Sequence, residues 1–237
     1  MLLSAPWECA SLEKLGDMDS VATPLWKGLR GRGCLWHRTS LDALRKIICD
    51  KQIIPNTGQF PTTTAQSTGS IARYISATSL FDFDTATEHE IYNQESKFSS
   101  VLTRYLPDVS ILIGIKRDNI IESELLLPSE IHDCPRISAL SEEDKLRLVY
   151  IPVVEALHLG PIQTSAFSSY IMTAFREGGG YHSHELGAAS VADPVSVMLN
   201  IGGEWIADHH RRVKERHSRG EYTLAEMLED IYARNNA

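Results

Sequence analysis

The stretch Leu35-Trp36-His37-Arg38-Thr39-Ser40 decides how the first half of the chain is expected to fold. Its apolar start predicts a short strand that ends near His37. A hydroxyl of Thr39 or Ser40 can then accept hydrogen bonds from the free N–H groups of a first helical turn. The residues that follow at helical spacing are Leu41, Leu44, Ile47 and Ile48, and Ile53-Ile54-Pro55 closes the unit. We therefore expect a strand–helix unit here.

A histidine at such a junction is held by regular structure on both sides. Two interpretations of His37 stay open at this point. Its ring either faces a cleft or packs beneath the helix that it precedes. The stretch alone does not show whether His37 belongs to a functional site or is a structural residue.

The composition predicts one large domain, or one domain with an appendage. The chain has 237 residues, of which 43% are hydrophobic and 23% are charged, and these values are usual for soluble globular proteins. The net charge of −8 gives no general attraction to nucleic acid or to an anionic membrane. A local basic patch stays open.

The cysteines and the lack of targeting signals indicate which cellular compartment to expect. The four cysteines, none of them in a CxxC pair, are Cys9, Cys34, Cys49 and Cys134. This spacing favours neither a disulfide framework nor a zinc site, and it fits a reducing compartment. We read no signal peptide in the first residues and no apolar run long enough to span a bilayer. The expected protein is cytoplasmic and has no membrane partner.

Strands and helices are expected to follow one another without regular βαβ alternation, which favours the α+β class. We expect an N-terminal extension over 1–34, a core over 35–180, and a helical C-terminal segment over 181–237 packed on the same domain. The long polar stretch 55–70 is expected to be either a functional flap or disordered.

Apolar periodicity predicts the individual elements. The predicted strands lie at 71–83, 110–115, 125–128 and 148–157. The predicted helices lie at 85–105, at 164–177 and at 223–231. The second of these has the clearest helical stripe, made of Phe167, Tyr170, Ile171, Ala174 and Phe175.

Glu155 is the most unusual residue of the later half, because it lies within the apolar run Val153-Val154-Glu155-Ala156-Leu157. An alternating strand would put it on the same face as Val153 and Leu157, the face expected to meet the core. Charged groups are rarely buried unless they are paired or hydrogen-bonded. Glu155 therefore either lines a cleft or belongs to a buried structural pair, and both interpretations stay open.

These pieces together resemble a known fold. His37-Arg38-Thr39 before a helix, a tyrosine and serine in 71–83, and Glu155 followed by Gly160-Pro161-Ile162 resemble the ADP-ribosyltransferase fold. The order and spacing are most similar to the DarT-type toxin enzymes, over roughly residues 35–175. The resemblance implies an α+β fold of split antiparallel sheets flanked by helices, with 35–180 as the catalytic core.

The activity that the resemblance implies is mono-ADP-ribosyl transfer from NAD to a macromolecular acceptor, which can be DNA, RNA or protein. A role as a toxin or phage-defence enzyme, with an antitoxin or immunity protein as partner, is implied as well. NAD is the substrate that carries the transferred group, and no metal is implied. The carboxylate of Glu155 would stabilise the positive charge that develops on the ribose as the bond to nicotinamide breaks. The resemblance also implies that Glu155 binds a ribose hydroxyl and can activate the acceptor.

The resemblance also implies the residues that bind NAD. His37 would hydrogen-bond the other ribose, Thr39 would support its ring or a phosphate, and Arg73 would pair with the pyrophosphate. Tyr74, or else Tyr150, would stack on the nicotinamide. The full implied set is His37, Arg38, Thr39, Arg73, Tyr74 and Ser76. Ser76 is a weaker member of this set, and Ser79 is an equally weak candidate outside it. For two of these residues an interpretation without a functional role stays open. Arg73 can be a surface cation, and Tyr74 can be a packed core residue.

Other functions remain as alternatives. One is an RNA 2′-phosphotransferase on the same fold, and another is a catalytically inert module that binds a nucleotide. The histidines of His182-Ser183-His184-Glu185 and His209-His210 invite a metal, but no third ligand follows at a recognisable spacing. The basic run over 211–216 is either a solvated helix face or a local contact for nucleic acid.

Overall fold

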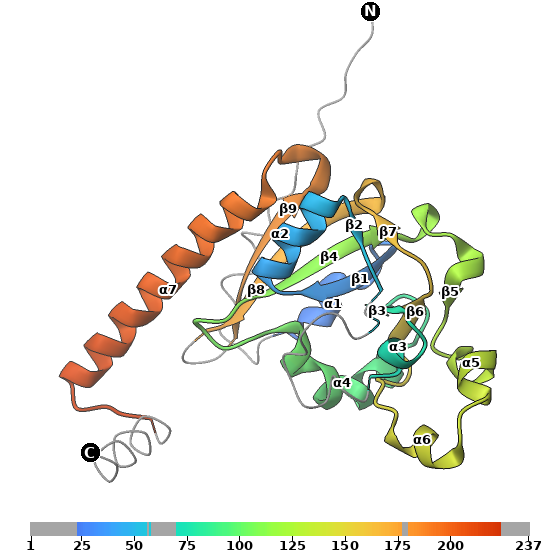
Figure 1. Cartoon of the computed structure of the whole chain (residues 1–237). Coiled ribbons are helices and arrows are strands. Elements are labelled where there is room, and N and C mark those ends of the chain that lie inside the picture. Colours follow the sequence, from blue (N-terminus) through green and yellow to red (C-terminus); the bar gives the residue numbers. More distant parts are fainter. Residues whose placement is uncertain (1–22, 56, 58–69, 177–179, 224–237) are drawn as a thin grey trace, which may run out of the picture.

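The computed structural model describes residues 23–55, 57, 70–176 and 180–223 as an α+β fold built on a seven-stranded antiparallel sheet (Figure 1). The strand order is β5-β6-β3-β1-β4-β8-β9. In chain order these strands are β1 (Cys34–Thr39), β3 (Thr78–Phe81), β4 (Ser110–Lys116), β5 (Leu125–Leu126), β6 (Glu155–His158), β8 (Phe167–Phe175) and β9 (Tyr181–Gly187). A separate pair consists of β2 (Gln52–Ile53) and β7 (Ile162–Gln163).

Helices flank this sheet. They are α1 (Leu25–Leu29), α2 (Leu41–Asp50), α3 (Ile71–Tyr74), α4 (Glu88–Leu102), α5 (Pro135–Ser138), α6 (Glu142–Arg147) and α7 (Pro194–Ser218). Among these described helices, none is long and apolar enough to cross a bilayer.

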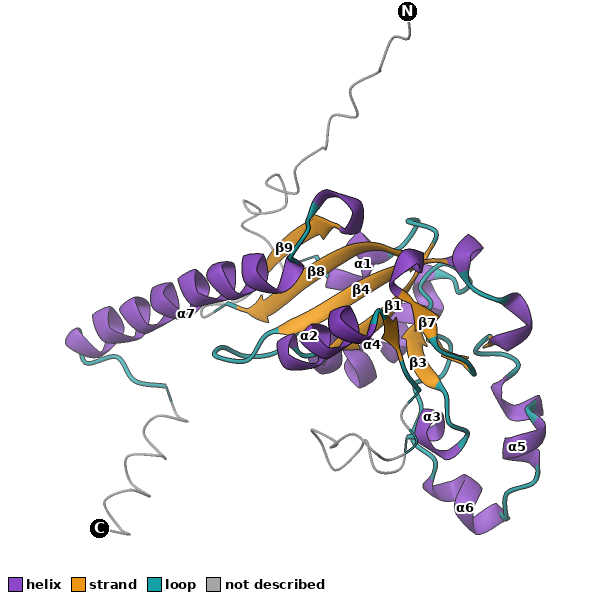
Figure 2. Ribbon diagram, turned by 45° about the horizontal axis from the view of Figure 1, so that its top comes forward, coloured by secondary structure: helices purple, strands orange, loops and turns teal. Residues whose placement is uncertain are grey.

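The sheet separates two apolar layers. On one side α2 and α7 contact each other, and Leu44 and Met198 are fully buried against the strands. On the other side lie α1 and α4, which contribute the fully buried side chains of Trp26 and Phe98. The C-terminal half of α7 extends beyond the sheet (Figures 1 and 2). The core therefore covers both faces of the central strands.

The two halves of the sheet meet at a narrow joint. β1 pairs with β4 at six positions, whereas its register with β3 consists of a single pair, Trp36 with Phe81. On the far side, β3 pairs with β6 at four positions. The half made of β1, β4, β8 and β9 and the half made of β3, β5 and β6 are thus joined at one level and diverge beyond it.

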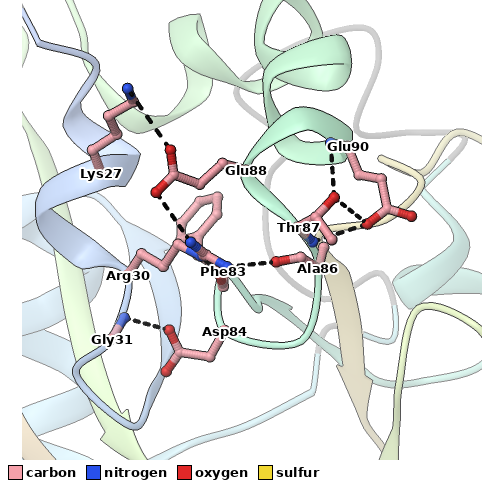
Figure 3. A network of polar contacts seen from close by, with 9 residues as sticks. All are labelled: Lys27, Arg30, Gly31, Phe83, Asp84, Ala86, Thr87, Glu88 and Glu90. Carbon is pink, nitrogen blue, oxygen red and sulfur yellow. Dashed lines mark hydrogen bonds and ion pairs between the residues drawn. The ribbon is translucent and has the colours of Figure 1, made fainter.

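One arginine ties the halves together at the other end of this joint (Figure 3). Nε of Arg30 donates to the carbonyl oxygen of Phe83 at 3.1 Å, and Nη2 donates to that of Ala86 at 3.0 Å. Nη1 lies 3.2 Å from the carboxylate of Glu88. Arg30 precedes β1 and its three partners follow β3, so the contact clamps the start of one strand to the end of the other.

Asp84 reinforces this clamp. The N–H groups of Gly31 and Gly33 donate to its two carboxylate oxygens at 2.6 and 3.0 Å. Both glycines are left-handed, with φ of 77° and 63°, a conformation that side chains with a Cβ adopt at a cost. The loop before β1 is therefore fixed against the connection that follows β3.

The expected strand–helix unit is confirmed. β1 ends at Thr39 and α2 begins at Leu41, while the Ser40 hydroxyl accepts a hydrogen bond from the N–H of Ala43 at 3.2 Å. The expected helix over 85–105, the buried strand over 110–115 and the short strand near 125–128 are confirmed as α4, β4 and β5. The α+β class is confirmed with them.

The strongest helix prediction is wrong, because residues 167–175 form β8, an interior strand of the sheet. This strand pairs with β4 on one side and β9 on the other. Tyr170, Ile171 and Met172 in succession are all buried, since a central strand covered on both faces is apolar at nearly every position. Such a run matches a helical stripe as well as it matches a strand.

Three other expectations need correction. The segment 181–237, expected to be helical, begins with the strand β9, and its described helix is α7. Within 71–83 the first turn is the helix α3, and the strand is confined to β3. The extended run 148–157 becomes a strand only at Glu155. The last predicted helix and most of the polar stretch 55–70 lie outside the described residues.

Arg30→Met should lower the free energy of unfolding by about 2 kcal/mol, because two carbonyl groups lose a charged donor. Arg147→Met is the matched control, since both partners of the Arg147–Glu143 pair are largely exposed, and it should change stability by less than about 0.5 kcal/mol. Urea unfolding followed by tryptophan fluorescence measures both. Equal midpoints for the two variants would contradict the assignment of Arg30 as a clamp.

Candidate active site

Ser79 of β3 lies where the two halves of the sheet diverge, and it contacts a predicted site residue on each side. Its carbonyl oxygen lies 3.1 Å from Nδ1 of His37 in β1. Its hydroxyl donates to Oε1 of Glu155 at 2.7 Å. The imidazole near the end of β1 and the carboxylate at the start of β6 are therefore held by one residue of the strand between them.

The hydrogen bond to Ser79 determines the tautomer of His37. A carbonyl oxygen only accepts, so Nδ1 carries the proton and Nε2 keeps a free lone pair. Burial lowers the pKa of His37 to about 4, although the hydrogen bond to Ser79 opposes this, and the charge of Arg38 adds a smaller lowering. At neutral pH the ring is uncharged, and Nε2 can accept a hydrogen bond from a ligand hydroxyl.

Glu155 is buried, with 5% of its surface exposed. Oε2 accepts a hydrogen bond from the N–H of Ile151 at 2.7 Å, which complements the bond from Ser79 to Oε1. Burial raises the pKa of the Glu155 carboxyl, and these two hydrogen bonds lower it. Among the described residues no lysine, arginine or histidine forms an ion pair with Glu155. The interpretation as a buried ion pair is thus not supported.

The loop before Glu155 is closed on itself. The N–H of Glu155 donates to the carbonyl oxygen of Ile151 at 3.0 Å, while the Ile151 N–H binds the Glu155 carboxylate. Inside this loop Val153 has φ of 75°, a left-handed conformation that a β-branched residue adopts only at a cost of about 1–3 kcal/mol. Strain of this kind persists where the surroundings fix it, and it is common beside functional groups.

Arg38 follows His37 and brings a positive charge to the same end of β1. Its side chain is partly buried, and its Nε donates to the hydroxyl of Ser110 at 3.0 Å. Burial lowers the pKa of Arg38 to about 10, and the nearby charge of Arg104 lowers it further while Asp108 opposes this. Within the described chain no carboxylate forms an ion pair with Arg38. Two neighbouring guanidinium groups of this kind favour an anionic ligand.

The other predicted residues are not brought into this hydrogen-bonded group. Thr39 is buried and pairs with Ile111 of β4. Arg73 and Tyr74 end the helix α3, and Ser76 is left-handed with φ of 57° in the turn before β3. No hydrogen bond or ion pair of the described residues joins these four to Ser79 or Glu155. Tyr74 is 45% exposed, so the interpretation of Tyr74 as a core residue is wrong.

Sequence reasoning underrated Ser79 and missed Arg104. The signal for Ser79 is weak, because the stretch from Ala77 to Phe83 also contains the polar residues Thr78 and Asp82. No local pattern marks Arg104, since it becomes important only when the chain brings it beside Arg38.

The cavities of the surface lie away from this hydrogen-bonded group. Two surface cavities of about 480 and 360 Å³ lie beside Arg30 and beside His158, and neither is lined by His37, Ser79 or Glu155. In the part of the chain that the structure describes, no three potential ligands gather to hold a metal ion. The site is therefore identified by the hydrogen bonds of Ser79 to His37 and Glu155, and by the charges of Glu155 and Arg38.

No protein-family model, no curated protein and no solved structure matches this chain.

The neutral state of His37 predicts a pH dependence of stability. Between about pH 4 and 6.5 the unfolded chain protonates this ring and the folded chain does not. The unfolded state then binds more protons, so the free energy of unfolding should fall as the pH is lowered through this range. His37→Asn keeps a donor for the Ser79 carbonyl but removes the titration, so its stability should fall less. Urea unfolding across the range measures the difference, and equal slopes would contradict the assigned neutral ring.

Proposed function

We propose that the protein is a mono-ADP-ribosyltransferase that uses NAD and modifies a macromolecular acceptor. The observation that carries the proposal is the pair of contacts made by Ser79. Through Ser79 they connect a neutral imidazole with a free lone pair to a buried carboxylate that forms no ion pair among the described residues. These two groups match the two needs of the reaction.

The first need is to stabilise positive charge on a sugar. When the bond between ribose and nicotinamide breaks, the ribose passes through an oxocarbenium-like state. A fixed negative charge in a poorly solvated place stabilises that state without having to reorganise. Glu155 is proposed to supply this charge, and each of its oxygens retains a lone pair for a ribose hydroxyl.

The second need is to hold the dinucleotide. Nε2 of His37 is proposed to accept a hydrogen bond from the other ribose. Arg38 is proposed to bind the pyrophosphate, and the nearby Arg104 is proposed to add a second positive charge. Thr39, Arg73, Tyr74 and Ser76 remain proposed NAD contacts, with the exposed ring of Tyr74 offered to the nicotinamide.

The sheet also supports the proposal. A split antiparallel architecture of the ADP-ribosyltransferase type requires two groups of strands that separate around the dinucleotide. Here β1 and β3 pair only at Trp36 and Phe81 among the described residues, and His37 and Ser79 lie just beyond that pair. The clamp at Arg30 keeps the opposite end closed.

The biological setting is part of the proposal. An enzyme of this type that modifies DNA, RNA or protein inside the cytoplasm would act as a toxin or phage-defence effector, and an antitoxin or immunity protein would restrain it. The acceptor is to be found by experiment, because His37, Ser79 and Glu155 concern the donor.

Glu155→Gln should abolish transfer of labelled ADP-ribose from NAD to separate DNA, RNA and protein pools, because the carboxylate charge is lost. The expected loss of rate is at least about 100-fold. Glu122→Gln is the matched control, since Glu122 is exposed in a short turn, and it should label like the wild type. Circular dichroism checks that both variants are folded.

Full labelling by Glu155→Gln would remove Glu155 from the mechanism. Tight binding of NAD to the wild-type protein without nicotinamide release would instead favour the inert nucleotide-binding module.

A further inference from the structure

A tyrosine that the proposed donor site does not use lies near Glu155 in the chain and is hydrogen-bonded to a histidine from another segment. Tyr150 directly precedes Ile151, whose N–H and carbonyl both bind Glu155. Burial raises the pKa of the Tyr150 phenol, and the negative charge of Glu155 raises it further. The phenol therefore lies within the electrostatic field of the carboxylate.

Tyr150 is coupled to an imidazole from a distant part of the chain. Its hydroxyl lies 2.5 Å from Nε2 of His132, and the two rings meet edge to face with centroids 5.3 Å apart. His132 belongs to a short 3-10 helix, Ile131–Asp133, and it is exposed. A proton that reached Tyr150 could thus pass to His132 and from there to solvent.

The backbone holds Tyr150 in this place. Residues 151–155 form a closed loop, with left-handed Val153 inside it. This loop restricts where the backbone of Tyr150 can lie relative to Glu155. On the other side Ile131 and Cys134 are buried, so the segment that carries His132 is anchored in the core. The pairing is therefore built by two anchored segments and does not depend on an exposed loop.

Glu155 itself is poorly suited to take a proton from the acceptor. Each of its oxygens already accepts one hydrogen bond, and the transition state needs its negative charge. A carboxylate that became protonated would lose that charge at the moment when it is required. A separate base would let the two tasks proceed together.

We propose that Tyr150 and His132 form a proton relay that activates the acceptor, an inference that rests on the proposed function. The lone pair of the acceptor oxygen or nitrogen forms a bond to the anomeric carbon of the ribose. Nicotinamide leaves with the electron pair of the broken carbon–nitrogen bond. The proton of the acceptor moves to the Tyr150 oxygen as the Tyr150 proton moves to Nε2 of His132, which releases one proton to solvent.

The relay gives the acceptor site a chemical preference. A nucleophile that bears a weakly acidic proton, such as a hydroxyl or an amide-like N–H, gains from a base held next to the ribose. Tyr150 is therefore a catalytic residue that contacts the acceptor, and His132 acts through it.

The test compares His132→Ala with His89→Ala in the full chain. His89 is an exposed histidine on α4 that is hydrogen-bonded to Asn93, so its variant should transfer ADP-ribose at the wild-type rate. His132→Ala should lower kcat for transfer about 100-fold and leave KM for NAD unchanged. Added imidazole should restore the rate of His132→Ala, and Tyr150→Phe should be slow in the presence or absence of imidazole.

The outcomes separate the relay from the donor chemistry. Wild-type rates in His132→Ala, or a loss that appears in KM for NAD and is not restored by imidazole, would overturn the relay alone. A wild-type protein that neither releases nicotinamide nor labels any acceptor would overturn the proposed function and the relay with it.

Discussion

A serine that uses its backbone and its side chain in different directions is the constraint on which this structure depends. The carbonyl of Ser79 fixes the protonation state of one ring, and its hydroxyl fixes the position of one carboxylate. The contact of the carbonyl with His37 would not form if β1 and β3 stayed paired along their whole length, because backbone N–H groups of β1 would then compete for that carbonyl. The divergence of the two strands is what makes this contact available.

The energetics explain why the arrangement points to a ligand. A buried carboxylate without a cationic partner is costly, and its two hydrogen bonds offset that cost only in part, since its pKa remains raised. Arg38 and Arg104 show the opposite imbalance, because Arg38 forms no ion pair among the described residues and the nearby carboxylate of Asp108 offsets the charge of Arg104 only in part. A ligand that brings an anionic group to one place and a developing positive charge to the other would relieve both. NAD has these two features, a pyrophosphate and a ribose that becomes cationic.

The sequence predicted the parts of the fold that local rules control. The strand–helix unit around His37 followed from apolar spacing and a capping hydroxyl, and β4 followed from a compact apolar run. β8 was mistaken for a helix because burial on both faces removes the alternation that identifies a strand. Of the site, His37 could be selected from its place at a strand–helix junction, and Glu155 could be selected because a charged group in an apolar run is unusual. Arg104 and His132 could not, since they approach Arg38 and Tyr150 only through the tertiary fold.

The central claim is that a single dinucleotide occupies the place where the imidazole of His37 and the carboxyl of Glu155 are held by Ser79. A crystal structure of the Glu155→Gln protein with NAD tests it most directly. The account predicts that one ribose binds Nε2 of His37 and that the ribose attached to nicotinamide lies against residue 155. NAD bound in another part of the molecule, or contacting one of these residues without the other, would contradict it.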